Sequence, residues 1–187
     1  MEHHIKLPLT KEKAAKLKSG DSVYLTGVIY TARDAAHKRL MALLEEGKTL
    51  PFPLEDAVVY YVGPTPAKPG QVIGSAGPTT SYRMDAYSPE LIRLGLTGMI
   101  GKGKRGAEVI EVIKQYGAVY FGAIGGAGAL LSECVKEAKV LAFEDLGAEA
   151  IHRLVVEEFP VTVVVDSTGN DLYKTGRAAY LAQQDRV

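Results

Sequence analysis

The second half of the chain alternates short apolar runs with segments of helical period, and this alternation constrains the fold more than any other feature of the sequence. The order is a helix over 107–117, a strand over 118–124, a glycine loop, a helix over 130–138 and a strand over 139–145. Strands that alternate with helices are typical of a parallel or mixed sheet covered by helices. The sequence therefore predicts an α/β domain.

The first half continues this pattern, with strands that end in polar or charged residues. Apolar runs rich in β-branched residues predict strands over 22–32, from Ala57 onward, over 72–77 and just before Lys102. A segment of helical period follows the first of these strands, with Arg33 at the junction. In open α/β sheets ligands bind outside the carboxyl ends of strands, so a binding site is expected at such junctions.

Three further segments carry signals for the start or end of an element. Thr10 is the expected N-cap of a short solvated helix that stops at Gly20. Ser88 is the expected N-cap of a second helix, with Pro89 at its first helical position. Residues 150–173 hold two β-rich runs and an Asn-Asp turn, which predict an additional β layer or hairpin.

Composition limits the class of protein. The 187 residues, 47% of them hydrophobic, suit one domain over 1–187. Lys+Arg and Asp+Glu both number 22, so no net field attracts nucleic acid or an anionic membrane. The single Cys134 excludes an internal disulfide framework and any zinc or iron-sulfur site built from this chain's cysteines alone. No signal peptide or long apolar segment is visible, so we expect a cytoplasmic protein with His3 and His4 inert in a frayed terminus.

One candidate site is a dinucleotide-binding unit in the second half of the chain. A strand, a glycine loop from Gly122 to Gly128, a helix and a second strand are followed by Glu144 and Asp145. The loop, however, has the order G-x-x-G-G-x-G instead of G-x-G-x-x-G. A nucleotide-binding α/β module is therefore one hypothesis, and a tight strand-helix turn that needs small residues explains the same loop.

A second candidate is a set of four side chains at or just beyond predicted strand ends: Arg33, Thr79, Arg83 and Lys102. Arginine binds a carboxylate through two parallel charge-assisted hydrogen bonds, and lysine adds a compact positive charge. Together they suit a small dicarboxylate. The alternative is that Arg33 and Arg83 are surface ion-pair partners of Asp34 and Asp85, while Thr79 and Thr80 close the Gly-Pro turn.

Three other residues have reactive side chains. His37 lies one helical turn after Arg33 and either orients substrate or relays a proton, or is a surface or packing residue of its helix. Cys134 is expected to be a buried small hydrophobe and not a nucleophile. His152 has no evident acid or base partner in the sequence and stays unassigned.

The strings "YTARDAAHKRL", "GPTTSYRMD", "GKGKRG", "GGAGALL" and "FPVTVVVDSTGNDLY" occur in this order over nearly the whole chain. The chain thereby resembles the β subunit, or C-terminal domain, of the iron-sulfur hydro-lyases that comprise class I fumarate hydratases and L-tartrate dehydratases. The resemblance implies a swivelling β/β/α domain. It also implies a four-iron four-sulfur cluster bound by three cysteines of a partner α subunit, so that this chain is one half of a hetero-oligomer and is inactive alone.

The same resemblance assigns roles to the second candidate set. It implies that Arg33 and Arg83 bind substrate carboxylates, that Lys102 binds substrate and that Thr79 is the catalytic base. Thr80 and Lys104 are chemically identical neighbours of Thr79 and Lys102, so these two assignments stay open. The lysine is followed here by Gly-Lys where relatives commonly have Gly-Asn. The implied reaction is reversible hydration of fumarate to malate, or dehydration of tartrate, between which the sequence does not choose.

Overall fold

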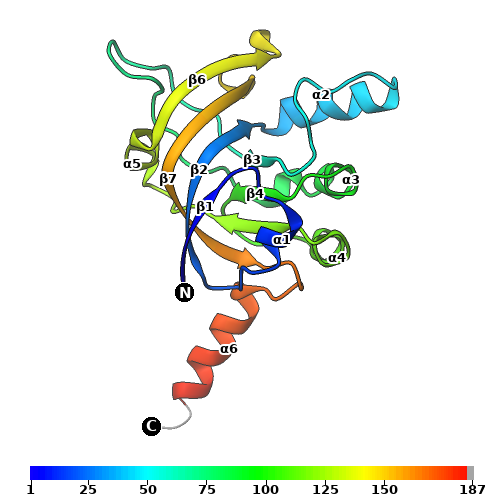
Figure 1. The fold of residues 1–187 in the computed structure, drawn as a ribbon, viewed down its shortest axis with the longest axis vertical. Helices are drawn as coiled ribbons and strands as arrows, with labels where there is room; N and C mark the ends of the chain where they lie inside the picture. Colours follow the sequence, from blue (N-terminus) through cyan, green and yellow to red (C-terminus); the bar gives the residue numbers. More distant parts are fainter. Residues whose placement is uncertain (185–187) are drawn as a thin grey trace.

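The computed structural model describes residues 1–184. Its first half contains β1 (Glu2–Lys6), α1 (Lys11–Ala14), β2 (Ser22–Thr31), α2 (Asp34–Glu45), β3 (Val58–Tyr60), the 3-10 helix η1 (Ser81–Met84), α3 (Ser88–Arg93) and β4 (Gly98–Gly101). Its second half contains α4 (Ala107–Tyr116), β5 (Val119–Gly122), α5 (Gly128–Glu133), β6 (Val135–Ala142), the 3-10 helix η2 (Glu144–Glu149), β7 (Ile151–Val165) and α6 (Leu172–Gln184). Helix α6 extends away from the rest of the molecule (Figure 1).

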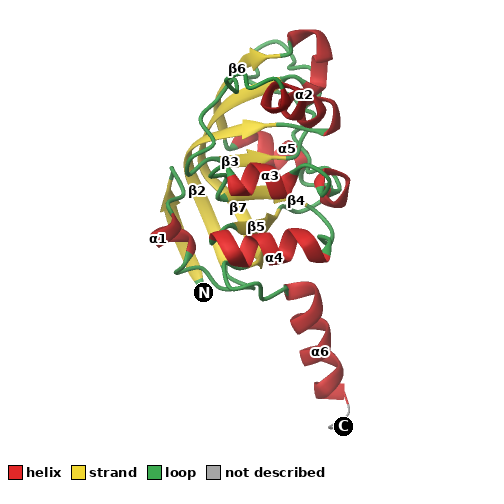
Figure 2. Ribbon diagram, turned by 90° about the vertical axis from the view of Figure 1, so that its right-hand side faces the viewer, coloured by secondary structure: helices red, strands yellow, loops and turns green. Residues whose placement is uncertain are grey.

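The described strands form one mixed sheet in the order β1-β2-β3-β4-β5-β7-β6, with an additional pairing of β2 to β7. Strands β2, β3, β4 and β5 pair in parallel, while β7 pairs antiparallel with β5, β6 and β2. The β2–β7 pairing joins the two sides of the sheet and closes β2, β3, β4, β5 and β7 into a ring. Helices α2, α3 and α4 lie on one face of this sheet (Figure 2). The predicted mixed sheet covered by helices is confirmed.

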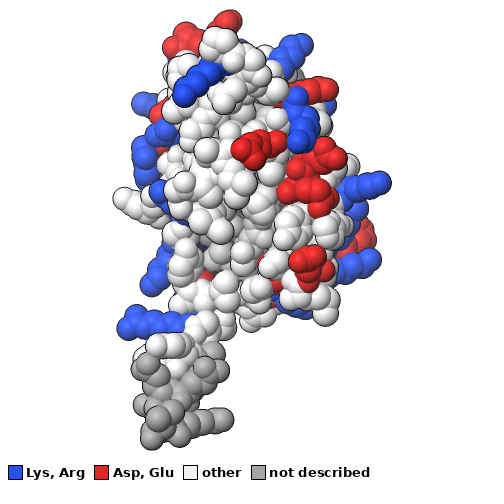
Figure 3. All heavy atoms as spheres, turned by 90° about the vertical axis from the view of Figure 1, so that its left-hand side faces the viewer, with Lys and Arg blue, Asp and Glu red and all other residues white. Residues whose placement is uncertain are grey.

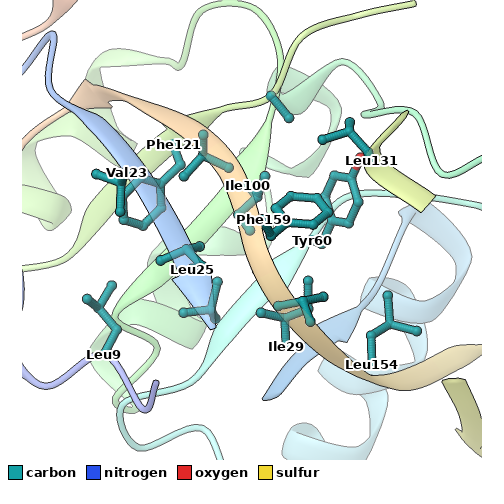
Figure 4. Close-up of a cluster of buried hydrophobic side chains, with 14 of the residues drawn as sticks. Leu9, Val23, Leu25, Ile29, Tyr60, Ile100, Phe121, Leu131, Leu154 and Phe159 are labelled. Carbon is teal, nitrogen blue, oxygen red and sulfur yellow. The ribbon is translucent and has the colours of Figure 1, made fainter. Parts of the chain in front are cut away.

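Two hydrophobic clusters lie on the two faces of the sheet. The run from Val58 to Tyr61 alternates between them: Val58 and Tyr60 face the inner cluster, and Val59 and Tyr61 face the cluster under the helices. This alternation follows from the two-residue period of a strand, and it explains why a strand buried on both faces has an unbroken apolar sequence. In the inner cluster the rings of Tyr60 and Phe159 meet edge to face, 5.3 Å apart (Figure 4).

The predicted N-cap at Thr10 is confirmed, whereas the predicted end of its helix at Gly20 and the predicted N-cap at Ser88 are wrong. The Thr10 hydroxyl accepts a hydrogen bond from the Lys13 N–H, so Thr10 is the N-cap, but helix α1 ends at Ala14 and not near Gly20. Helix α4 ends at Gly117, whose φ of 74° is the left-handed conformation that glycine adopts without a Cβ penalty. In α3 the N-cap is Tyr87, because Ser88 already has helical geometry.

Two predicted elements are wrong. Residues 72–77 form no strand; they run as a loop in which the Ala76 N–H donates to the Gly128 carbonyl. The predicted helix over 130–138 stops at Glu133, and β6 begins at Val135. The residues after Cys134 pair antiparallel with β7, the next strand along the chain, so hydrogen bonds to another strand override the local helical preference.

The ends of the chain also differ from expectation. Residues 2–6 form β1, parallel to β2, and His3 Nε2 lies 3.0 Å from an Asp21 carboxylate oxygen, so this terminus is not frayed. Residues 151–165 form one 15-residue strand, whose hairpin partner is β6. Helix α6 follows the Asn-Asp turn and was not expected from the sequence.

The described surface carries both signs of charge. The face in Figure 3 has a broad uncharged centre, with basic side chains along its left margin and both acidic and basic side chains along its right margin. This mixture agrees with equal totals of basic and acidic residues. No helix in the described part of the chain has the length and apolar character needed to cross a membrane.

Candidate active site

Thr79 and Lys102 lie side by side at the carboxyl ends of neighbouring parallel strands. The Thr79 N–H donates to the carbonyl of Tyr61, just after β3, at 2.7 Å. The Lys102 N–H donates to the Thr79 carbonyl at 3.3 Å, and Thr80 forms a parallel bridge with Lys102 just after β4. The "GPTTSYRMD" segment therefore lies at the carboxyl ends of β3 and β4, where ligands of α/β sheets bind.

Arg83 is joined to the start of helix α2. Its Nε donates to Asp34 Oδ1 at 3.0 Å, and its Nη2 lies 2.9 Å from Asp34 Oδ2. The alternative of an ion pair is thus correct for Arg83, but the partner is Asp34 and not Asp85. Asp85 instead accepts from Nε of Arg105 at 2.6 Å.

Arg33 lies one residue before α2 and is held by η2. Its Nη2 is 3.4 Å from Glu149 Oε1, while the other oxygen of Glu149 accepts the Ala35 N–H at 2.9 Å. The distance from Arg33 Nε to the Asp34 carboxylate is 4.0 Å, and this buried Nε has no hydrogen-bond partner in the described residues. A Cβ at Gly63 would come within 2.7 Å of Arg33 Nη1, so glycine gives the guanidinium room to cross the backbone.

The remaining polar groups of the set are uncommitted. Within residues 1–184, neither the Lys102 ammonium nor the hydroxyls of Thr79 and Thr80 form a hydrogen bond or ion pair. Lys102 is exposed, and its Nζ lies 3.8 Å from where a Cβ of Gly125 would stand. Lys104 is also exposed and unpaired among the described residues. These groups are available to a ligand.

A buried polar network under this segment was missed by the sequence interpretation. The Arg105 side chain is fully buried, and its Nη2 donates to the Ser88 hydroxyl at 2.7 Å. Its guanidinium lies 5.4 Å from the ring centroid of Tyr61 and 4.9 Å from that of Tyr120. The Tyr120 hydroxyl donates to the Ser81 hydroxyl at 2.9 Å. Nothing in the local sequence separates Arg105 from the two exposed lysines that precede it.

His37 packs inside the molecule and does not face solvent. Its Nδ1 lies 2.8 Å from the Arg33 carbonyl, which identifies Nδ1 as the protonated nitrogen because a carbonyl can only accept. The imidazole lies between the rings of Tyr61 and Tyr87. Burial lowers the pKa of His37 to about 4. The packing interpretation is confirmed, and the buried Nε2 has no partner in the described residues.

Cys134 and His152 show no arrangement for nucleophilic catalysis. Burial raises the pKa of the Cys134 thiol, which keeps it protonated and disfavours attack. His152 Nδ1 lies 2.9 Å from the Ala150 carbonyl and 3.2 Å from the Thr31 hydroxyl, and burial lowers its pKa. Among residues 1–184, no group of three or more His, Cys, Asp or Glu side chains is placed to hold a metal ion.

The dinucleotide-binding interpretation of residues 122–128 is wrong. In such a unit the strand after the helix lies in the sheet parallel to the strand before it. Here the strand before the helix is β5, which is flanked by β4 and β7, and the strand after it is β6, which pairs only with β7 and in antiparallel direction. Helix α5 has six residues, too few to provide a strong helix dipole. The acidic Asp145 is already paired with Arg39.

The fold and these side chains define an α/β domain whose strand ends present arginine, lysine and threonine, a set suited to small carboxylates. The sequence model described as Fumarase C-terminus matches residues 1–176, and the chain belongs to this family.

Three named relatives illustrate the range of this family. The chain is 42% identical, over 89% of its length and 88% of the other, to "Putative L(+)-tartrate dehydratase subunit beta" of Methanocaldococcus jannaschii. It is 40% identical over 80% of its length to "Fumarate hydratase class I, anaerobic" of Escherichia coli K12, and 36% identical over 90% to "Fumarate hydratase 2" of Leishmania major. The chain spans only 28% and 30% of these two longer proteins.

Proposed function

We propose that this chain is the β subunit of a hydro-lyase that reversibly hydrates fumarate to malate or dehydrates tartrate. Relatives named tartrate dehydratase subunit beta and fumarate hydratase support this proposal. The observation that carries it is the convergence of the "GPTTSYRMD" segment with Lys102 at the strand ends, beside uncommitted hydroxyls. A nucleotide-binding function lacks the strand pairing that it requires.

The proposed chemistry suits these side chains. Addition or removal of water beside a carboxylate builds negative charge on that carboxylate in a carbanion-like state. Fixed cationic donors stabilise such charge because they need no reorganisation as it develops. Arg33 and Arg83 bind the carboxylates in this proposal, and the Lys102 ammonium adds a third positive charge at the same edge.

Thr79 is proposed to hold or move the substrate proton. Its hydroxyl has no hydrogen-bond partner among the described residues, so a ligand can take that position. A threonine hydroxyl is a poor base in water, and only nearby cations such as Lys102 make proton removal feasible. The neighbouring Thr80 has an equally free hydroxyl, which makes the choice between them a matter for experiment.

An iron-sulfur cluster, with which class I fumarate hydratases are associated, does not fit the residues of this chain. Cys134 is the only cysteine, and no group of metal-binding side chains forms in the described part. We therefore assign the four-iron four-sulfur cluster to a cysteine-bearing α subunit, and the complex to a hetero-oligomer. A cytoplasmic location is part of this proposal, since a lone cysteine suits a reducing compartment.

The proposal is tested by co-expressing this chain with a cysteine-bearing α subunit under anaerobic conditions. The cluster-loaded pair is expected to consume fumarate or tartrate, with the ultraviolet absorbance of fumarate as the measurement. The isolated chain is expected to be inactive. Failure of the loaded pair on both substrates overturns the proposed function.

Arg83→Ala is expected to lower kcat/KM of the loaded pair by at least about 100-fold, because one fixed cationic donor is lost. Cluster content and assembly should stay unchanged. Arg93→Ala is the matched control, since Arg93 is an exposed arginine of α3 paired with Glu90. Retention of most activity by the Arg83 variant contradicts its proposed role.

Thr79→Val removes one hydroxyl while keeping the shape of the side chain. We expect kcat to fall by about 100-fold or more, the range of general acid–base catalysis, while Thr80→Val changes kcat by a few-fold at most. Single-turnover kinetics on both variants measures this difference. A larger fall in kcat for Thr80→Val than for Thr79→Val assigns the proton-transfer role to Thr80.

A further inference from the structure

We propose that Asp34 is a positioning residue that orients Arg83 for a substrate carboxylate. This inference rests on the proposed function and adds a residue to it. Asp34 is the first residue of α2 and contacts the guanidinium of Arg83, which belongs to η1, 49 positions further along the chain. It therefore links the two segments that carry the proposed carboxylate-binding arginines.

The contact uses only one edge of the Arg83 guanidinium. Nε donates to Asp34 Oδ1 and Nη2 lies 2.9 Å from Oδ2, so the two groups meet side by side. A guanidinium has five N–H donors, and Nη1 has no partner among the described residues. The Arg83 side chain is 43% exposed. The unused donors thus remain free to form a bidentate pair with a ligand carboxylate.

Asp34 also lies close to the second arginine. Its Oδ2 is 4.0 Å from Nε of Arg33, so one carboxylate stands between two guanidinium groups. The first turn of a helix favours a negative charge, and Asp34 is the first residue of α2. The two arginines are thereby kept at a fixed separation with less mutual repulsion, as recognition of a dicarboxylate requires.

Preorganisation is the physical benefit of this arrangement. A free arginine side chain loses conformational entropy when it is immobilised. If Asp34 immobilises Arg83 during folding, the ligand does not bear this cost on binding. An ordinary exposed ion pair does not affect ligand binding. The effect on binding therefore distinguishes a positioning role of Asp34 from an ordinary surface ion pair with Arg83.

The helix offers a matched control. Arg39 of α2 forms a bidentate pair with Asp145 through Nη1 at 2.7 Å and Nη2 at 2.5 Å. This pair is also exposed, and it contains none of the residues of the proposed site. Asp34→Asn and Asp145→Asn therefore each remove one negative charge from an ion pair with an arginine, and only the first lies beside Arg83.

In the cluster-loaded pair, Asp34→Asn is expected to raise KM for the dicarboxylate about tenfold with a smaller change in kcat, and Asp145→Asn is expected to leave both unchanged. Added to Arg83→Ala, Asp34→Asn should cause little further loss, because both changes remove one interaction. An unchanged KM in Asp34→Asn, or an equal loss with and without Arg83, overturns the inference.

A second measurement uses the isolated chain and does not depend on activity. The Arg83 Nε–H signal in 15N NMR is expected to be sharp and slow to exchange in the wild type and to broaden in Asp34→Asn, but not in Asp145→Asn. An Arg83 signal that Asp34→Asn leaves unchanged contradicts the inference. A well-ordered Arg83 together with an inactive loaded wild type instead overturns the proposed function alone.

Discussion

The charged residues of the candidate site differ in how far the protein itself already uses them. Arg33 and Arg83 are engaged by Glu149 and Asp34, whereas Lys102 has no internal partner in the described residues. An engaged arginine is fixed in direction, and a free lysine can follow a ligand as a mobile point charge. The two kinds of cation therefore suit two tasks, orientation and charge neutralisation.

His37 makes the stability of the fold depend on pH. Burial lowers the pKa of His37 in the folded state from 6.5 to about 4. The positive charge of Arg105 also lowers this pKa, whereas the hydrogen bond to the Arg33 carbonyl raises it. Below pH 6.5 the unfolded chain binds a proton that the folded chain excludes. Stability contributed by neutral His37 is thus present above pH 6.5 and is lost as the pH falls toward 4.

We expect the free energy of unfolding to fall by up to about 1.4 kcal/mol per pH unit through this window because of His37. In His37→Phe, which cannot bind a proton, urea unfolding between pH 7 and pH 4.5 should show a smaller fall. Identical slopes in the two proteins contradict a proton-excluding role for His37.

At the scale of elements, the short helix η1 depends on the buried network beneath it. Arg105 connects Asp85, next to η1, with Ser88 at the start of α3. Asp85 also accepts the Gly106 N–H, so its two oxygens hold the adjacent residues Arg105 and Gly106 at the end of the loop between β4 and α4. This network fixes the backbone that presents Thr79 and Arg83.

Arg105→Met is expected to lower the free energy of unfolding by about 3 kcal/mol, because breaking a buried ion pair leaves its partner uncompensated. Arg93→Met removes an exposed arginine paired with Glu90 and should change stability by less than about 0.5 kcal/mol. Urea unfolding followed by circular dichroism measures both. Equal effects of the two substitutions contradict the buried network.

At the scale of the whole molecule, the parallel pairing of β2, β3 and β4 determines where the site can form. Their carboxyl ends share one edge of the sheet, and the β2–β7 pairing closes this sheet into a ring. Arg33 and Lys102 come just after β2 and β4, and Thr79 lies at the same edge because its N–H donates to the Tyr61 carbonyl just after β3. Helix α6 and helix α2 lie at opposite ends of the molecule (Figure 1).

Much of this architecture was predictable because its signals are local. The unbroken apolar run around Val59, the glycine after α4 and the change of period after β2 each act within one element. The mixed sheet, the covering helices and the positions of Arg33 and Lys102 at strand ends followed from them. Thr79 was singled out at the end of a predicted strand over 72–77 that does not form, and its place at the sheet edge comes from its hydrogen bond to the Tyr61 carbonyl just after β3.

The sequence by itself determined the elements with strong local signals, among them β2, α2, β4, α4 and β5, and it placed Arg33 and Lys102 at strand ends, because propensity and period are properties of neighbouring residues. Only the tertiary structure decided that β6 replaces a predicted helix, that Asp34 and not Asp85 holds Arg83, and that Arg105 is buried. Each of these outcomes depends on a partner in another element: β7 for β6, Arg83 49 positions after Asp34, and Asp85 20 positions before Arg105. The deciding energy therefore comes from tertiary pairing and burial that no local pattern encodes.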